Sequence, residues 1–176
     1  HNEKAREILA EGGARIDGVR VRIPEFMVTQ ALSQAPKRLM LYDREGKPAI
    51  RAQGYNTYYG GGSDCLNVLD HRTGERRRPT LKDVIEASTV MDALPEIDFV
   101  MSLFLPEEVD QSIYDRYQMA AMLEHTTKPI VFVSPDFEGC RAAVEMCEAV
   151  AGGPEAFQRK PFATGYINVT SGLIAN

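Results

Sequence analysis

The stretch Ile97–Leu105, IDFVMSLFL, decides the fold, because it is a nearly continuous apolar run of the kind that forms a buried strand. Two comparable stretches follow at Pro129–Val133 and Ala163–Thr170. The three begin 32 and 34 residues apart, and each interval has room for a helix. Repeated βαβ units have this spacing. Strands without strict alternation indicate a parallel sheet, so we predict three adjacent parallel strands in this order.

Helical patterns surround these strands. Residues 81–94 place apolar side chains on one face at helical spacing, and we predict a helix there. A second helix is predicted from about Glu107 to Glu124. A third is predicted from about Phe137 to Val150, ending at Gly152-Gly153. A doubly wound sheet and a (β/α)₈ barrel are both compatible with this alternation.

Residues 1–95 lack that period and mix short elements. A helix is predicted over residues 3–11, a hairpin around Asp17-Gly18, and a helix over residues 25–34 after Pro24. A second hairpin joins residues 39–42 to 49–51, and strand candidates at 57–59 and 65–69 flank Gly60–Gly62. We therefore predict a separate α+β layer over residues 1–95.

The stretch Leu69–Asp83, LDHRTGERRRPTLKD, joins the two halves. Gly74 allows a polar turn, and Thr80 with Asp83 has the spacing of a helix capping box. The stretch resembles the trimethylamine:corrinoid methyltransferase family, in which such a run precedes the catalytic barrel. The matching residues are Asp70, Thr73, Gly74, Glu75, Arg76, Arg77, Thr80 and Asp83.

Further short motifs occur in the family's order, so the resemblance covers nearly the whole chain. They include Lys128-Pro129-Ile130, Arg159–Phe162 and Asn168–Ser171. One departure is Ser171-Gly172-Leu173, where family members often have Ser-Pro-Leu.

The resemblance implies the fold class α/β. The chain would comprise the α+β layer followed by the first βα units of a TIM (β/α)₈ barrel. A barrel needs about 250 residues, and 80 follow residue 96. Residues 96–176 would then hold the first three strands and two helices of an incomplete barrel. Three strands cannot close and leave open edges, so we expect an amino-terminal fragment that is inactive alone.

The resemblance also implies the activity, which is methyl transfer from trimethylamine, or a quaternary amine such as glycine betaine, to the cobalt of a corrinoid protein. The corrinoid is carried by that partner protein, and no cofactor is bound directly. In-line displacement at a methyl carbon mainly requires orientation and desolvation, so no catalytic triad or metal is needed. The pyrrolysine of the trimethylamine branch would lie downstream of this chain. A homo-oligomer is expected.

Active groups of a barrel lie where its strands end, which makes Phe104, Ser134, Asn168 and Ser171 the candidates for substrate binding. Tyr58 and Tyr59 are further candidates, because aromatic faces attract quaternary ammonium groups. They would reach the site only if the amino-terminal layer covers that face. No catalytic residue is predicted.

Two other functions remain open, the first because it shares the βα rhythm and the second because the barrel is incomplete. Another barrel enzyme, of the lyase or aldolase type, would carry a lysine or metal-binding carboxylates on later strands. A truncated chain could instead serve as a non-catalytic binding module.

Composition excludes several classes of function. The net charge of −5 argues against a nucleic-acid partner. No run of about 18 apolar residues predicts a membrane span. The three cysteines form no disulfide framework, since Cys140 and Cys147 would lie about 10 Å apart on their helix. Free thiols fit the cytoplasm, and the scattered histidines lack the spacing of a zinc site.

Overall fold

The computed structural model describes residues 3–170 and 174–175. It divides into two compact units, His1–Lys37 and Arg38–Asn176. Each unit is described by itself. None of the helices in the described residues has the length and apolar character needed to span a membrane.

The first unit contains the three elements predicted for it. Helix α1 spans Glu3–Glu11, strands β1 and β2 span Arg15–Asp17 and Arg20–Arg22, and helix α2 spans Glu25–Gln34. The strands pair antiparallel around Gly18, whose φ of +60° suits a tight turn. Among residues 3–37, which the structure describes, Ala14 is the one buried apolar residue, so these residues form almost no core of their own.

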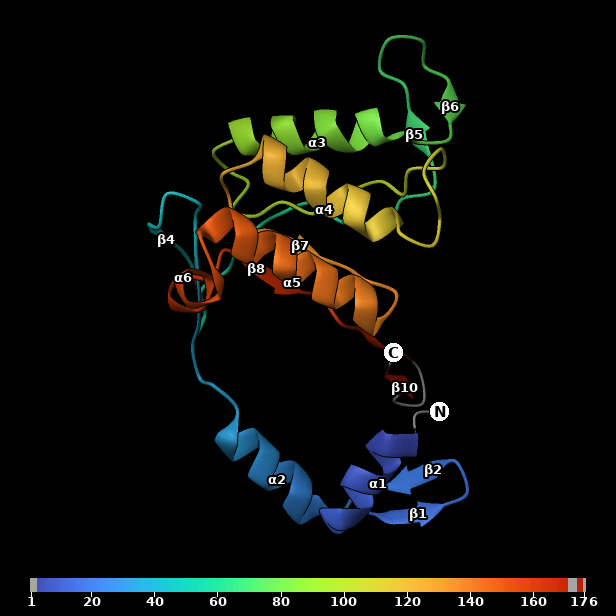
Figure 1. The fold of residues 1–176 in the computed structure, drawn as a ribbon, viewed down its shortest axis with the longest axis vertical. Coiled ribbons are helices and arrows are strands. Elements are labelled where there is room, and N and C mark those ends of the chain that lie inside the picture. The colour runs from blue at the N-terminus through green and yellow to red at the C-terminus, as the bar shows by residue number, and fades with distance from the viewer. Residues whose placement is uncertain (1–2, 171–173, 176) are drawn as a thin grey trace. The chain divides into compact units, whose positions relative to one another are not determined.

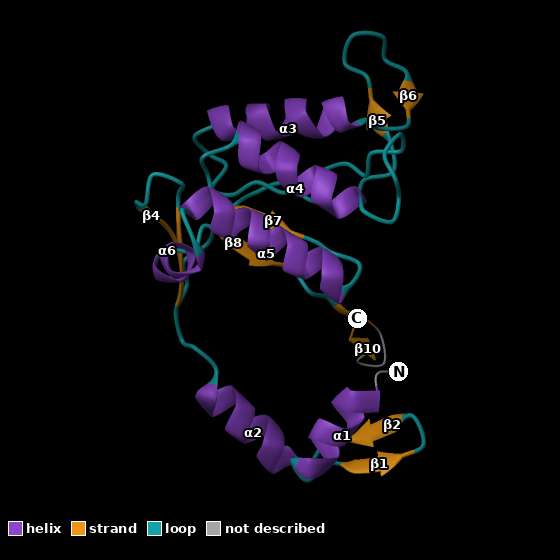
Figure 2. Ribbon diagram, viewed as in Figure 1, coloured by secondary structure: helices purple, strands orange, loops and turns teal. Residues whose placement is uncertain are grey.

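Two antiparallel hairpins begin the second unit. Strands β3, Leu39–Tyr42, and β4, Pro48–Ala52, pair with Leu41 opposite Ile50, and both of these side chains are buried. Strands β5, Val68–Leu69, and β6, Arg76–Arg77, flank the predicted polar turn. Both hairpins are short, and Figure 2 shows mostly irregular chain between β4 and β5.

The predicted parallel strands are confirmed in order and direction. Strand β7, Ile130–Phe132, pairs in parallel with β8, Ala163–Gly165. Val100 forms a parallel bridge with Ile130 on the other side of β7. The first predicted strand is held by such single bridges rather than by a regular ladder. The third is shorter than predicted: its parallel pairing ends at Gly165, and Val169–Thr170, strand β9, pairs antiparallel with β10, Ile174–Ala175.

The parallel array extends further upstream than the sequence indicated. Gly60 bridges Phe99 and Cys65 bridges Phe104, both in parallel. Residues 60–65 are therefore a fourth parallel segment, although their sequence placed them in the separate layer. Glycine is a poor predictor of strand. It is needed here because a Cβ at Gly60 would collide with the Phe99 ring, and one at Gly61 would lie 2.6 Å from Met91 Sδ.

Three helices cross over between successive parallel segments. They are α3, Leu81–Ala93, α4, Tyr114–His125, and α5, Phe137–Ala151. They lie side by side on one face of the array, with α4 between the other two (Figure 1). A short helix, α6, Pro154–Arg159, follows α5 and was not predicted.

Helix α4 begins later than predicted. Residues 107–113 form a loop in which Asp110 Oδ1 accepts hydrogen bonds from the Ser112 amide, at 2.9 Å, and the Ser112 hydroxyl, at 2.8 Å. The Gln111 side chain donates to the Pro106 carbonyl at 2.8 Å. Such local side-chain bonds to the backbone compete with helix formation.

The core lies between the three helices and the array. Val100 and Ile130 of the array meet Met119 and Met122 of α4 and Cys147 of α5, all essentially inaccessible to solvent. Burial of each large apolar side chain contributes about 1.5–3 kcal/mol. Phe99 and Val131 alternate with these core residues and are only half-buried on the opposite face of the array.

Candidate active site at the carboxyl ends of the parallel segments

Three neighbouring parallel segments end at polar or aromatic residues. Asp64 closes the first, Phe104 the second and Ser134 the third. Parallel pairing brings these ends to one edge of the array. Two of the residues predicted from sequence, Phe104 and Ser134, therefore lie at the same edge. Asn168 follows β8 and is exposed, and Ser171 lies outside the described residues.

The first turns of α4 connect these ends. The Gln118 amide donates to Asp64 Oδ1 at 3.3 Å and to the Phe104 carbonyl at 2.8 Å. The Ser134 hydroxyl donates to Asp115 Oδ2 at 2.7 Å. Gln118 and Asp115 are 2% and 6% exposed. We call these five residues the α4 polar network.

Gly139 of α5 makes room for part of this network. A Cβ at that position would collide with Asp115 Oδ2 and Ser134 Oγ. The amide of Gly139 donates instead to Asp136 Oδ1 at 2.7 Å, which caps α5. The glycine therefore lets the buried Ser134–Asp115 bond form against the start of α5.

The edge has a negative electrostatic character. Burial raises the pKa of Asp64, while the hydrogen bond from Gln118 opposes that rise. Burial also raises the pKa of the Tyr114 hydroxyl, and the nearby carboxylates of Asp64, Asp115 and Asp136 raise it further. A cation placed here would stabilise the ionised form of Asp64.

The backbone is unusual at the same edge. Asp64 and Leu103 have φ values of 55° and 59°, which residues with a Cβ rarely adopt. They lie on neighbouring segments, and the Cys65 amide donates to the Leu103 carbonyl at 3.0 Å. Such strain costs about 1–3 kcal/mol per residue and clusters at functional sites.

Tyr58 and Tyr59 lie at the opposite edge of the array. The Tyr59 amide donates to Asp98 Oδ2 at 2.8 Å, and the Tyr58 hydroxyl accepts a 2.9 Å hydrogen bond from the Arg51 amide. Asp64 follows Tyr59 by five positions, and five positions of extended chain span about 16 Å. The structure does not bring these tyrosines to the candidate active site.

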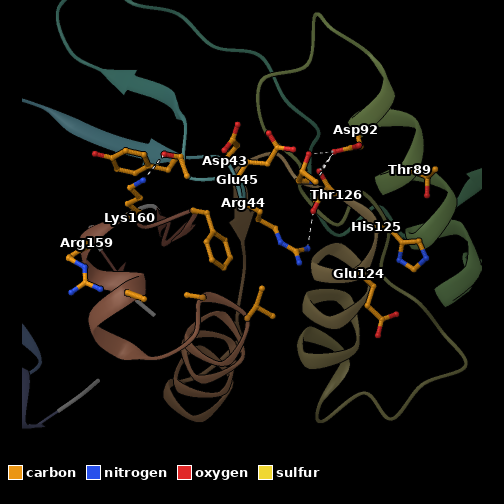
Figure 3. A pocket seen from close by; sticks show the side chains of 17 residues that line it. Asp43, Arg44, Glu45, Thr89, Asp92, Glu124, His125, Thr126, Arg159 and Lys160 are labelled. Atoms are coloured by element: carbon orange, nitrogen blue, oxygen red, sulfur yellow. Dashed lines mark hydrogen bonds between the residues drawn. The ribbon is translucent and has the colours of Figure 1, made fainter.

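A cavity of about 1,150 Å³ lies at that opposite edge (Figure 3). Arg44 reaches from the β3–β4 turn to the end of α4, where it donates to the carbonyls of Leu123 and Thr126. Lys160 Nζ lies 5.9 Å from the centre of the Tyr42 ring. These contacts hold the β3–β4 hairpin against the end of α4 and against Lys160. Nothing in the sequence pattern indicated this cavity.

The residues of the junction stretch have a structural role. Arg77 forms a bidentate ion pair with Asp83, at 2.7 and 2.8 Å, and contacts Asp70 Oδ2 at 3.3 Å. Asp83 and Thr80 form the predicted capping box of α3. Arg77 thereby holds the pKa of Asp83 far below its ordinary value. These contacts fix the β5–β6 hairpin to α3 beside a cleft of about 340 Å³ that Phe104 also lines.

No group of three or more His, Cys, Asp or Glu side chains placed to hold a metal ion is found within residues 3–170 and 174–175. The candidate active site contains the half-buried carboxylate of Asp64, the Tyr114 hydroxyl and hydrogen-bonding groups. Such a set can bind and orient a cationic molecule.

The chain is similar to enzymes that act on methylated amines. The model of the trimethylamine methyltransferase (MTTB) family matches residues 1–176. Trimethylamine methyltransferase MttB of Desulfitobacterium hafniense (strain DSM 10664 / DCB-2) is 28% identical over 174 residues, which cover 98% of this chain and 35% of that protein.

Two other relatives have lower identity. Glycine betaine methyltransferase of Desulfitobacterium hafniense (strain Y51) is 22% identical over 169 residues, covering 94% of this chain and 35% of that protein. Trimethylamine methyltransferase MttB of Methanosarcina barkeri is 24% identical over 163 residues, covering 89% and 33%.

The chain thus spans about a third of the length of these relatives. The family match runs through both compact units and includes the junction stretch that suggested the resemblance. The chain belongs to the trimethylamine methyltransferase family.

Proposed function

We propose that the protein transfers a methyl group from a methylated amine to the cobalt of a corrinoid carried by a partner protein. The family supports methyl transfer, and its relatives are named for two donors, trimethylamine and glycine betaine. The single observation that carries the proposal is the α4 polar network, which gathers the ends of three parallel segments around negative charge.

We also propose that the array is part of a TIM barrel. Its four parallel segments follow chain order, and its three crossover helices lie on one face. A doubly wound sheet would carry helices on both faces. The half-buried opposite face, with Phe99 and Val131, would then form part of the barrel interior.

In the proposed reaction, the residues of this chain bind and orient the donor. The Asp64 carboxylate attracts the cationic nitrogen, and the strand ends hold the amine so that one methyl group points outward. The corrinoid supplies the nucleophile. The methyl group would pass to that nucleophile as the carbon–nitrogen bond breaks, and the nitrogen would keep the electron pair of the broken bond and depart as a neutral amine. Orientation and exclusion of water are the main contributions of the protein.

The test measures methyl transfer by the full-length protein to a reduced corrinoid protein, with trimethylamine and with glycine betaine as donors. Loss of the reduced-cobalt absorbance and release of dimethylamine or dimethylglycine are followed together. Transfer from either donor supports the proposal. Binding of amines without any transfer would favour the binding module, and absence of both would reject the proposed function.

Two further properties are proposed with this function. A cytoplasmic location would keep the corrinoid reduced, and the free thiols of Cys65, Cys140 and Cys147 are compatible with it. A homo-oligomer is proposed as well, and sedimentation of the purified protein would test it.

A further inference from the structure

The structure assigns charge selection to one side chain: we propose that Asp64 is the residue that selects positively charged amines, and that Gln118 is its positioning residue. The inference rests on the proposed function, because it names the group that would recognise the donor. It concerns specificity rather than the transfer step itself.

Asp64 differs from the other carboxylates at this edge of the array. Asp136 is used as the cap of α5, and the buried Asp115 accepts the Ser134 hydroxyl. Asp64 receives a single long hydrogen bond, from Gln118 at 3.3 Å. Among the residues that the structure describes, no cation pairs with Asp64 and no hydrogen bond reaches its Oδ2. This oxygen is therefore the one available to a ligand.

The backbone fixes where this carboxylate lies. Asp64 adopts a left-handed φ of 55°, between two hydrogen bonds that tie its segment to the next. The Leu103 amide donates to the Gly62 carbonyl at 2.9 Å, and the Cys65 amide donates to the Leu103 carbonyl at 3.0 Å. The two hydrogen bonds hold the Asp64 backbone in this strained conformation, and the conformation in turn fixes the direction of the Asp64 side chain.

Gln118 holds the side chain from the other direction. Its amide nitrogen has two hydrogens, one for the Phe104 carbonyl at 2.8 Å and one for Asp64 Oδ1. The glutamine is 2% exposed, so its own conformation is fixed by packing in α4. Movement of Asp64 would leave a buried amide hydrogen of Gln118 without a partner, which is unfavourable.

A cationic ligand would relieve an unfavourable charge at this point. Asp64 is half-buried without a cation, beside Tyr114 and the carboxylates of Asp115 and Asp136. A trimethylammonium group would compensate this negative charge, whereas an uncharged group of the same shape would not. The site should therefore distinguish molecules that differ only in charge.

The experiment uses the full-length protein and two ligands of the same shape. Glycine betaine has a trimethylammonium head, and 3,3-dimethylbutanoate has the uncharged carbon equivalent. Calorimetry gives the ratio of their dissociation constants, with trimethylamine as a third ligand. The wild-type protein should prefer glycine betaine, and Asp64→Asn should reduce that preference about tenfold. Asp110→Asn, in an exposed loop, is the matched control and should keep it.

Gln118 is tested by comparison with a second glutamine. Gln111 also donates to a backbone carbonyl, that of Pro106 at 2.8 Å, and in the described part of the chain no hydrogen bond joins it to Asp64. Gln118→Met should raise KM for the amine more than it lowers kcat, while Gln111→Met should change neither. In the double variant Asp64→Asn/Gln118→Met, the loss of preference should equal that of Asp64→Asn alone, because Gln118 acts through Asp64. The Gln118 variants also test the inference independently if Asp64→Asn does not fold.

The outcomes separate this inference from the proposed function. A wild-type protein that neither binds nor demethylates amines would reject both. A wild-type protein that prefers glycine betaine, with the preference intact in folded Asp64→Asn or in Gln118→Met, would reject the inference and leave methyl transfer standing. Additive losses in the double variant would show that Gln118 does not act through Asp64.

Discussion

At the scale of single residues, the candidate active site depends on close contacts that only a small side chain permits. Gly139 lies against the Ser134–Asp115 hydrogen bond, and its replacement by Ala would push a methyl group into both partners. Such overpacking costs about 1–3 kcal/mol, more than the roughly 1 kcal/mol gained when Ala replaces Gly inside a helix.

Gly139→Ala is therefore expected to lower the free energy of unfolding, as measured by urea denaturation. Gly62→Ala is the control, because no atom lies within 4 Å of its added Cβ; its effect should stay within about 0.5 kcal/mol. Equal free energies of unfolding for the two variants would contradict this expectation, because they would mean that α5 moves to accommodate the added methyl group without loss of stability.

The ion pair between Arg77 and Asp83 makes a prediction for pH. Because Arg77 lowers the pKa of Asp83 in the folded protein, its stabilisation is present above the unfolded-state pKa of about 3.9 and is lost as the pH falls further. Asp83→Asn should cost about 1.5–3 kcal/mol at neutral pH and should flatten the fall in stability below pH about 4. Denaturation curves across pH 3–7 would contradict this role if the wild type and the variant differed by the same amount throughout.

At the scale of elements, basic side chains from distant parts of the chain stabilise the carboxyl ends of the crossover helices. Lys128 Nζ donates to the carbonyls of Met91, at 2.8 Å, and Leu94, at 2.5 Å, at the end of α3. Arg44 serves the end of α4 in the same way. Cations at these ends satisfy unpaired carbonyls and oppose the negative end of the helix dipole.

Lys128→Met is therefore expected to lower stability by about 0.3–1 kcal/mol, measured by thermal unfolding. Lys82→Met is the control, because Lys82 lies in the first turn of α3 and pairs only loosely with Glu86, at 3.7 Å. A larger loss for Lys82→Met would contradict the argument from helix ends.

At the scale of the whole molecule, the chain consists of two units that differ in how much they bury. The second unit holds the methionine-rich core, while Ala14 is the one buried apolar residue that the structure describes in the first. The boundary at Lys37 and Arg38 is exposed, and both residues are trypsin sites. Exposed segments with few packing contacts are cut first.

Limited trypsin digestion of the full-length protein should therefore cleave after Lys37 or Arg38 before it cleaves after Arg44 or Arg77. The latter two side chains are held within the second unit, Arg44 by the Thr126 carbonyl and Arg77 by the Asp83 carboxylate. Mass spectrometry of the early fragments checks the order, and first cleavage within the second unit would show that the boundary is protected.

The sequence by itself determined the elements and the family. Helices α1, α2, α3 and α5, both early hairpins and the order of three parallel strands follow from local periodicity, turn residues and capping, which act over a few neighbouring positions. The motif of the junction stretch indicated the family, which the family model confirms. The capping box was predicted from Thr80 and Asp83, and the structure contains it.

Only the tertiary structure decided which distant residues meet. Residues 60–65 join the array because their glycines leave room for the side chains of Phe99 and Met91. This reason becomes visible only when the neighbouring segment and helix are in place. Asp64 and Gln118 are 54 residues apart, and no local pattern marks either as a member of one site. Tyr58 and Tyr59 have the right chemistry for a methylated amine but lie at the wrong edge. Local sequence specifies the type of an element, whereas packing over long separations decides which strand end faces which helix turn.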